Sequence, residues 1–132
     1  MNEKKLKTLL WMRHLLVAFM YNDDPNKCWE KIMVHIMIAS PKTLEEDKNS
    51  PLQGIDQKVV SDFAKGYMMA MAKYKDIKIA NEKMRDKIKN TLMKNLGYSE
   101  EELMKDIKFL HAKSDLMING IHIDNTDPIT NN

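Results

Sequence analysis

The sequence predicts an all-α protein, a single compact bundle of about five helices, with a short C-terminal β-hairpin as an open alternative. Three observations predict this class. Only four glycines and four prolines occur among 132 residues, so tight turns between strands have few places to form. Apolar side chains recur three or four residues apart over long segments, as on one face of a helix. The 43% apolar and 30% charged content is typical of a globular chain of one domain.

The first predicted helix runs from about Glu3 to Tyr21 and is apolar around most of its circumference. Such a helix needs cover on most sides, either from the rest of the domain or from a second copy of the chain. Arg13 and His14 interrupt its apolar run, which is also too short to cross a bilayer. We therefore expect a core helix and no membrane contact.

A second helix is predicted to begin at Asp24-Pro25, where an N-cap residue precedes a proline in the first turn, and to end before Pro41. Residues 31–39 alone also fit a buried strand, but the length and the cap favour a helix. Residues 40–54 are expected to form one long connection with a short helical turn at residues 43–47. The expected buried stripe of the second helix consists of Cys28, Trp29, Ile32, Met33, Ile36 and Met37.

The third predicted helix extends from Ile55 to Tyr74, is amphipathic and has Asp56 at its start. Its apolar face contains Gly66 and two alanines, so we expect another helix to pack against it at close range. A fourth helix is predicted from about residue 77 to residue 96, and Gly97 suits a left-handed C-cap there.

The fifth predicted helix opens with a capping box formed by Ser99 and Glu102 and continues through Leu110. Asn119-Gly120 either caps this helix or turns a hairpin that pairs residues 116–118 with residues 121–123. Both alternatives stay open at this point. The expected organisation is one helical domain over residues 1–123 and a flexible C-terminal tail over residues 124–132.

The sequence holds no Gly-rich phosphate loop, nucleophile elbow or paired-histidine zinc helix. His122, Asp124 and Asp127 are closely spaced, and His111 could approach them, but this alternation alone does not define a metal site. We therefore predict a chain that is not an enzyme and has no metal and no cofactor. Cys28 is the one cysteine, which excludes an intrachain disulfide and favours a cytoplasmic location.

The leading functional hypothesis is a small accessory or regulatory protein that binds a protein partner through a Met-rich helical surface. Twelve methionines are unusual for this length, and methionine suits surfaces that adapt to a partner. A homodimer is also expected, because a symmetric interface needs only one self-complementary patch. Small size and a strong excess of lysine over arginine fit a phage or mobile-element inhibitor or adaptor. The candidate anchors are Trp11, Phe19, Trp29, Met68 and Met69.

The alternative is a nucleic-acid-binding protein that uses the basic segment 73–94. This segment carries seven lysines and one arginine against three carboxylates, and phosphate binding needs several cations on one face. A helix-turn-helix around Gly97 is weakened because the second helix would begin with three glutamates. The candidate residues are Lys73, Lys83, Arg85, Lys87 and Lys94.

Overall fold

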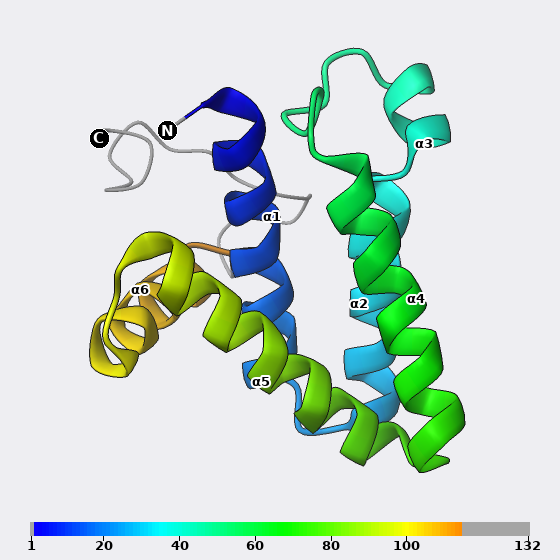
Figure 1. Cartoon of the computed structure of the whole chain (residues 1–132), viewed down its shortest axis with the longest axis vertical. Helices are drawn as coiled ribbons and strands as arrows, with labels where there is room; N and C mark the ends of the chain where they lie inside the picture. The colour runs from blue at the N-terminus through cyan, green and yellow to red at the C-terminus, as the bar shows by residue number, and fades with distance from the viewer. Residues whose placement is uncertain (1, 115–132) are drawn as a thin grey trace.

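The computed structural model describes residues 2–114 and confirms the all-α prediction: this part of the chain contains six helices and no strand (Figure 1). The short α3 corresponds to the helical turn that was predicted within the long connection. The expected tail and the C-terminal hairpin lie outside the described residues. In chain order the helices are α1 (Glu3–Met20), α2 (Pro25–Ile38), α3 (Pro41–Glu46), α4 (Gln57–Tyr74), α5 (Ile77–Leu96) and α6 (Glu100–Ser114).

The helix ends follow from local side-chain chemistry. Asp24, Asp56 and Asp76 precede α2, α4 and α5, and each accepts hydrogen bonds from two backbone N–H groups of the first turn. These bonds satisfy donors that the helix itself leaves without a partner. At the end of α5, Gly97 adopts φ +66°, a left-handed conformation that costs glycine little. The α6 capping box forms as predicted, with Ser99 and Glu102 each accepting from the other's backbone N–H.

Helix α1 is the centre of the molecule (Figure 1). Every residue from Thr8 to Phe19 is buried except the half-buried Val17. Helices α2, α5 and α6 pack directly against α1. Helix α4 reaches it through Phe63, whose ring lies edge-on to Trp11 with 5.8 Å between ring centroids. The chain therefore covers α1 with its own other helices. None of the described helices is long and apolar enough to span a membrane.

Helix α4 packs along α5 at close range, as the glycine in its apolar face predicted. A Cβ atom added at Gly66 would lie 3.5 Å from the Cε atom of Met84. At the next residue of α4, the Tyr67 hydroxyl donates a hydrogen bond to the Asn81 side chain of α5. The Asn81 amide in turn donates to the carbonyl of Pro25 at 3.2 Å. These buried polar groups fix the relative positions of α4, α5 and the start of α2.

Met37 corrects one detail of the predicted burial. Its position in the second helix was expected to be buried, but 58% of its surface is exposed. Cys28 and Ile32 of the same stripe are buried, whereas Trp29, Met33 and Ile36 are half-buried. The buried side of α2 is therefore narrower than the apolar sequence pattern suggested.

Arg13 is a charged residue inside the core, with only 1% of its side chain exposed. Its Nη2 atom lies 2.8 Å from the Oδ1 atom of Asp106 in α6, whose side chain is 10% exposed. An ion pair removed from water in this way contributes little net stability but leaves a costly charge behind if one partner is deleted. The Arg13–Asp106 pair therefore fixes α6 against the middle of α1.

We predict that Asp106→Ala lowers the free energy of unfolding by about 3 kcal/mol, because it deletes the carboxylate that contacts the buried Arg13 guanidinium at 2.8 Å. Denaturant unfolding followed by circular dichroism measures this change. Asp62→Ala is the matched control: it deletes the carboxylate of the exposed Lys58–Asp62 pair and should cost less than about 1 kcal/mol. Equal losses in the two variants would contradict a structural role for the buried pair.

Candidate functional site

The five predicted protein-binding anchors divide into core and surface residues. Trp11 is 0% exposed and Phe19 is 7% exposed, and the Trp11 indole donates a hydrogen bond to the backbone carbonyl of His35 at 2.9 Å. Both side chains belong to the packing around α1, so neither lies on a surface that a partner can reach. Trp29 is half-buried against the same core.

Met68 and Met69 are exposed, as a binding surface requires. Their exposed fractions are 44% and 71%, and they are neighbours in the C-terminal half of α4. Ala72, one turn further along α4, is also exposed, and so are the flanking Lys65 and Lys73. We call Met68, Met69 and Ala72 the α4 methionine patch. It is a short apolar strip bordered by flexible cations.

The junction of α4 and α5 brings two of the predicted nucleic-acid-binding cations together. The Nζ atoms of Lys73 and Lys83 lie 5.3 Å and 5.8 Å from the ring centroid of Tyr74. Both lysines are exposed, and Tyr74 is half-buried between them. Cations at these distances from an aromatic ring are attracted to its face.

The other predicted cations are distributed less evenly. Lys87 and Lys94 are exposed, and the spacing from Lys83 to Lys87 and Lys94 places all three on one side of α5. Arg85 departs from this row, because it is half-buried and its guanidinium pairs with Asp86 at 3.2 Å. Lys83, Lys87 and Lys94 therefore share one side of α5, and Lys73 lies beside Lys83 at the Tyr74 ring. Arg85 is paired with Asp86 next to this row.

The start of α6 does not favour a DNA-reading helix. Glu100, Glu101 and Glu102 are all exposed in its first turn, where contacts to phosphates and bases would be made. Glu100 pairs with Lys89 and Glu101 pairs with Lys105, which still leaves the charge of Glu102 at this end of the helix. The exposed acidic first turn of α6 therefore weighs against a helix-turn-helix around Gly97, for the reason that the sequence suggested.

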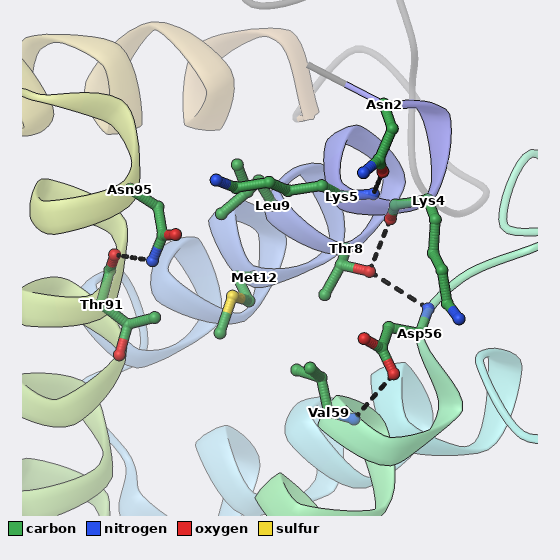
Figure 2. A pocket seen from close by; sticks show the side chains of 10 residues that line it. All are labelled: Asn2, Lys4, Lys5, Thr8, Leu9, Met12, Asp56, Val59, Thr91 and Asn95. Atoms are coloured by element: carbon green, nitrogen blue, oxygen red, sulfur yellow. Dashed lines mark hydrogen bonds between the residues drawn. The ribbon is translucent and has the colours of Figure 1, made fainter.

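Sequence reasoning missed a groove at one end of the molecule, with a volume of about 290 Å³. It lies where the start of α1, the start of α4 and the end of α5 meet (Figure 2). No sequence pattern could have located it, because the three lining segments are far apart along the chain. The lining residues are Asn2, Lys4, Lys5, Thr8, Leu9, Met12, Asp56, Val59, Thr91 and Asn95.

The hydrogen bonds around this groove hold its wall in place. Thr8 Oγ1 donates to the carbonyl of Lys4 at 2.8 Å and accepts from the backbone N–H of Asp56 at 3.1 Å. The Asp56 carboxylate accepts from the backbone N–H groups of Lys58 and Val59. One threonine thus connects the first turns of α1 to the N-cap of α4.

The buried nucleophile and the histidines provide no catalytic arrangement within residues 2–114. Burial raises the pKa of the Cys28 thiol to about 11, an effect that Lys31 slightly opposes, so the reactive thiolate is disfavoured. His14 is 5% exposed, and its ring lies 6.2 Å from that of His35. No group of three or more metal-ligating side chains occurs in this part of the chain. His122, Asp124 and Asp127 lie outside it.

Comparison of the chain with protein-family models, with curated proteins and with solved structures finds no match. The functional inference is therefore carried by the geometry of the described residues alone.

His35 makes stability depend on pH. Burial, with a smaller contribution from the nearby Lys31 ammonium, lowers the pKa of His35 from 6.5 to about 4. The unfolded chain binds a proton on this residue more readily than the folded chain does. The contribution of neutral His35 to the free energy of unfolding is therefore fully present above pH 6.5. It is lost as the pH falls from 6.5 toward 4.

We predict that the free energy of unfolding contributed by His35 falls by about 2 kcal/mol between pH 7 and pH 5. Denaturant unfolding at the two pH values measures the loss, and His35→Gln, which cannot take up this proton, should lose correspondingly less. A wild-type protein as stable at pH 5 as at pH 7 would contradict a neutral, half-buried His35.

Proposed function

We propose that the chain is a small, non-catalytic accessory or regulatory protein that binds a protein partner through the α4 methionine patch. The observation that carries the proposal is the pair of adjacent exposed methionines, of which Met69 is 71% exposed. Large apolar side chains in water favour association because binding removes their surface from solvent.

The chemistry of methionine suits this role. Its side chain is unbranched and polarizable, so it can adjust to the shape of a partner. Lys65 and Lys73 flank the patch, and flexible cations at the rim of an interface favour a partner that carries acidic groups around an apolar centre. Because Trp11 and Phe19 are part of the core, the anchoring role falls to Met68 and Met69.

A second copy of the chain is one partner that fits this proposal, because an isologous interface needs only one patch that complements itself. A foreign target would make the protein an inhibitor or an adaptor, of the kind that phages and mobile elements encode. The buried, unreactive Cys28 is compatible with action in the cytoplasm, where thiols stay reduced.

We predict that Met68→Gln combined with Met69→Gln weakens partner binding at least tenfold, because it removes the apolar centre of the interface. Light scattering after size exclusion measures self-association, and affinity capture from the native host followed by titration measures binding of a foreign partner. The free energy of unfolding should change by less than about 0.5 kcal/mol, because both positions are on the surface.

Met20→Gln is the matched control for this test. Met20 is 38% exposed at the end of α1, so the same chemical change is made outside the patch. A partner that is lost equally from both variants, or from neither, would contradict the assignment of the interface to α4.

The second candidate function is nucleic-acid binding by the basic surface of α4 and α5. The observation that favours it is the placement of the Lys73 and Lys83 Nζ atoms at 5.3 Å and 5.8 Å from the centroid of the Tyr74 ring, because a base can stack on an aromatic side chain while cations contact phosphates. Lys87 and Lys94 extend the cationic row along α5.

Charge reversal with Lys83→Glu and Lys87→Glu separates the two functions. If the chain binds nucleic acid, this double variant should lower affinity for every sequence about tenfold or more and reduce the salt dependence of binding. Fluorescence anisotropy with single- and double-stranded probes measures both effects. Binding of a protein partner through Met68 and Met69 should change little, and complete absence of wild-type binding to the probes would exclude the second function.

A further inference from the structure

A candidate ligand site lies in the groove between α1, α4 and α5, away from the α4 methionine patch. Its floor is apolar and consists of Leu9, Met12 and Val59 (Figure 2). Leu9 and Met12 are 3% and 7% exposed, so most of each side chain is core and only a small part faces the groove. The volume of about 290 Å³ lies at the small end of the roughly 300–1,000 Å³ found for small-molecule sites.

The rim of this groove carries an excess of positive charge. In Figure 2 the Lys5 side chain extends from α1 in the direction of α5, and the Lys4 side chain extends toward the start of α4. Neither ammonium group pairs with a carboxylate among residues 2–114, whereas the neighbouring Lys7 is paired with Glu3. The two groups at the groove are thus available to an anion.

The other polar groups at the rim do not oppose the binding of an anion. Among the lining residues of the described part of the chain, Asp56 is the one carboxylate. Its Oδ1 atom already accepts hydrogen bonds from two backbone N–H groups of α4. The side-chain oxygen of Asn2 accepts from the Lys5 backbone N–H at 2.7 Å. Because this bond uses the Asn2 oxygen, the Asn2 NH₂ group remains as an additional hydrogen-bond donor at the rim.

We propose that the groove binds a small amphipathic carboxylate, an alkyl chain of about six to ten carbons ending in one carboxyl group. The alkyl chain would cover the parts of Leu9, Met12 and Val59 that face the groove. The carboxylate would lie at the rim within reach of the Lys5 ammonium, and Lys4, which extends toward the start of α4, would add positive charge to the same rim. A cation is disfavoured by the two ammonium groups, and a fully polar anion would leave the apolar floor in contact with water.

The wall of the groove exists before the ligand arrives. The Thr8 hydroxyl accepts a hydrogen bond from the Asp56 backbone N–H at 3.1 Å and so holds α1 to the N-cap of α4. Binding therefore requires little ordering of the backbone. Lys4 and Lys5 are exposed, however, and exposed ion pairs contribute modestly to binding. We therefore expect a dissociation constant on the order of 1 mM for an alkyl carboxylate of this size.

The test uses the full chain with ¹³C-labelled methionine methyl groups, titrated with octanoate, octanol and octylammonium. The Met12 methyl resonance, assigned by its loss in Met12→Leu, reports on the groove, and those of Met68 and Met69 report on the separate methionine patch. We expect octanoate to shift the Met12 resonance and to bind about fivefold more tightly than octanol, with octylammonium weakest.

Lys4→Gln combined with Lys5→Gln should weaken octanoate binding about fivefold and make it similar to octanol binding. Lys27→Gln combined with Lys42→Gln is the matched control, because it removes the same charge from exposed positions that do not line the groove and should leave the affinity unchanged.

Three results would overturn the proposal. They are an unshifted Met12 resonance at about 10 mM octanoate, roughly tenfold above the expected constant, equal affinities for octanoate and octylammonium, and an equal loss of affinity in the two lysine variants. None of them bears on Met68 and Met69, so this site and the proposed protein interface can fail independently.

Discussion

The fold depends on one constraint: a helix that is apolar around nearly its whole circumference has to be removed from water on every side. From Thr8 to Phe19, α1 meets this condition because α2, α5 and α6 pack directly on it and α4 reaches it through Phe63. Burial of that surface is the main favourable contribution to folding. The arrangement of the other helices follows from the need to surround α1. The buried Arg13 is tolerated there because Asp106 of α6 approaches it at 2.8 Å.

The same constraint determines where a partner can bind. The aromatic side chains of α1 are buried by the packing of the chain itself. The large apolar side chains that stay exposed lie mainly on the surrounding helices, among them Met37 of α2 and Met68 and Met69 of α4. The groove arises for a related reason. At its N-terminus α1 is polar and exposed, whereas its buried part begins at Thr8. Lys4 and Lys5 therefore lie at the rim of the groove, next to the apolar side chains of Leu9 and Met12. The methionine patch, the basic surface and the groove therefore lie on the helices that surround the central one or at the helix ends.

The sequence allowed the helices to be predicted because their ends depend on local chemistry. Asp24, Asp56 and Asp76 cap the turns that follow them, and Gly97 takes up the left-handed conformation that ends α5. The site was harder to predict. Aromatic residues such as Trp11 and Phe19 occur in a helix sequence both when the helix is buried within its own chain and when it binds a partner. Only the tertiary structure distinguishes these two cases. The groove could not be predicted, because Thr8, Asp56 and Asn95 come together only when three distant segments pack.

Native-state hydrogen exchange tests the central position of α1 most directly. If the other helices surround α1, its amides from Leu9 to Phe19 should be the slowest in the described part of the chain and should exchange only when the whole molecule unfolds. The outer turns of α4 around Met68 and Met69 should open with a smaller free energy. Amides of α1 that exchange faster than those of α4 would contradict a fold built around a fully covered central helix.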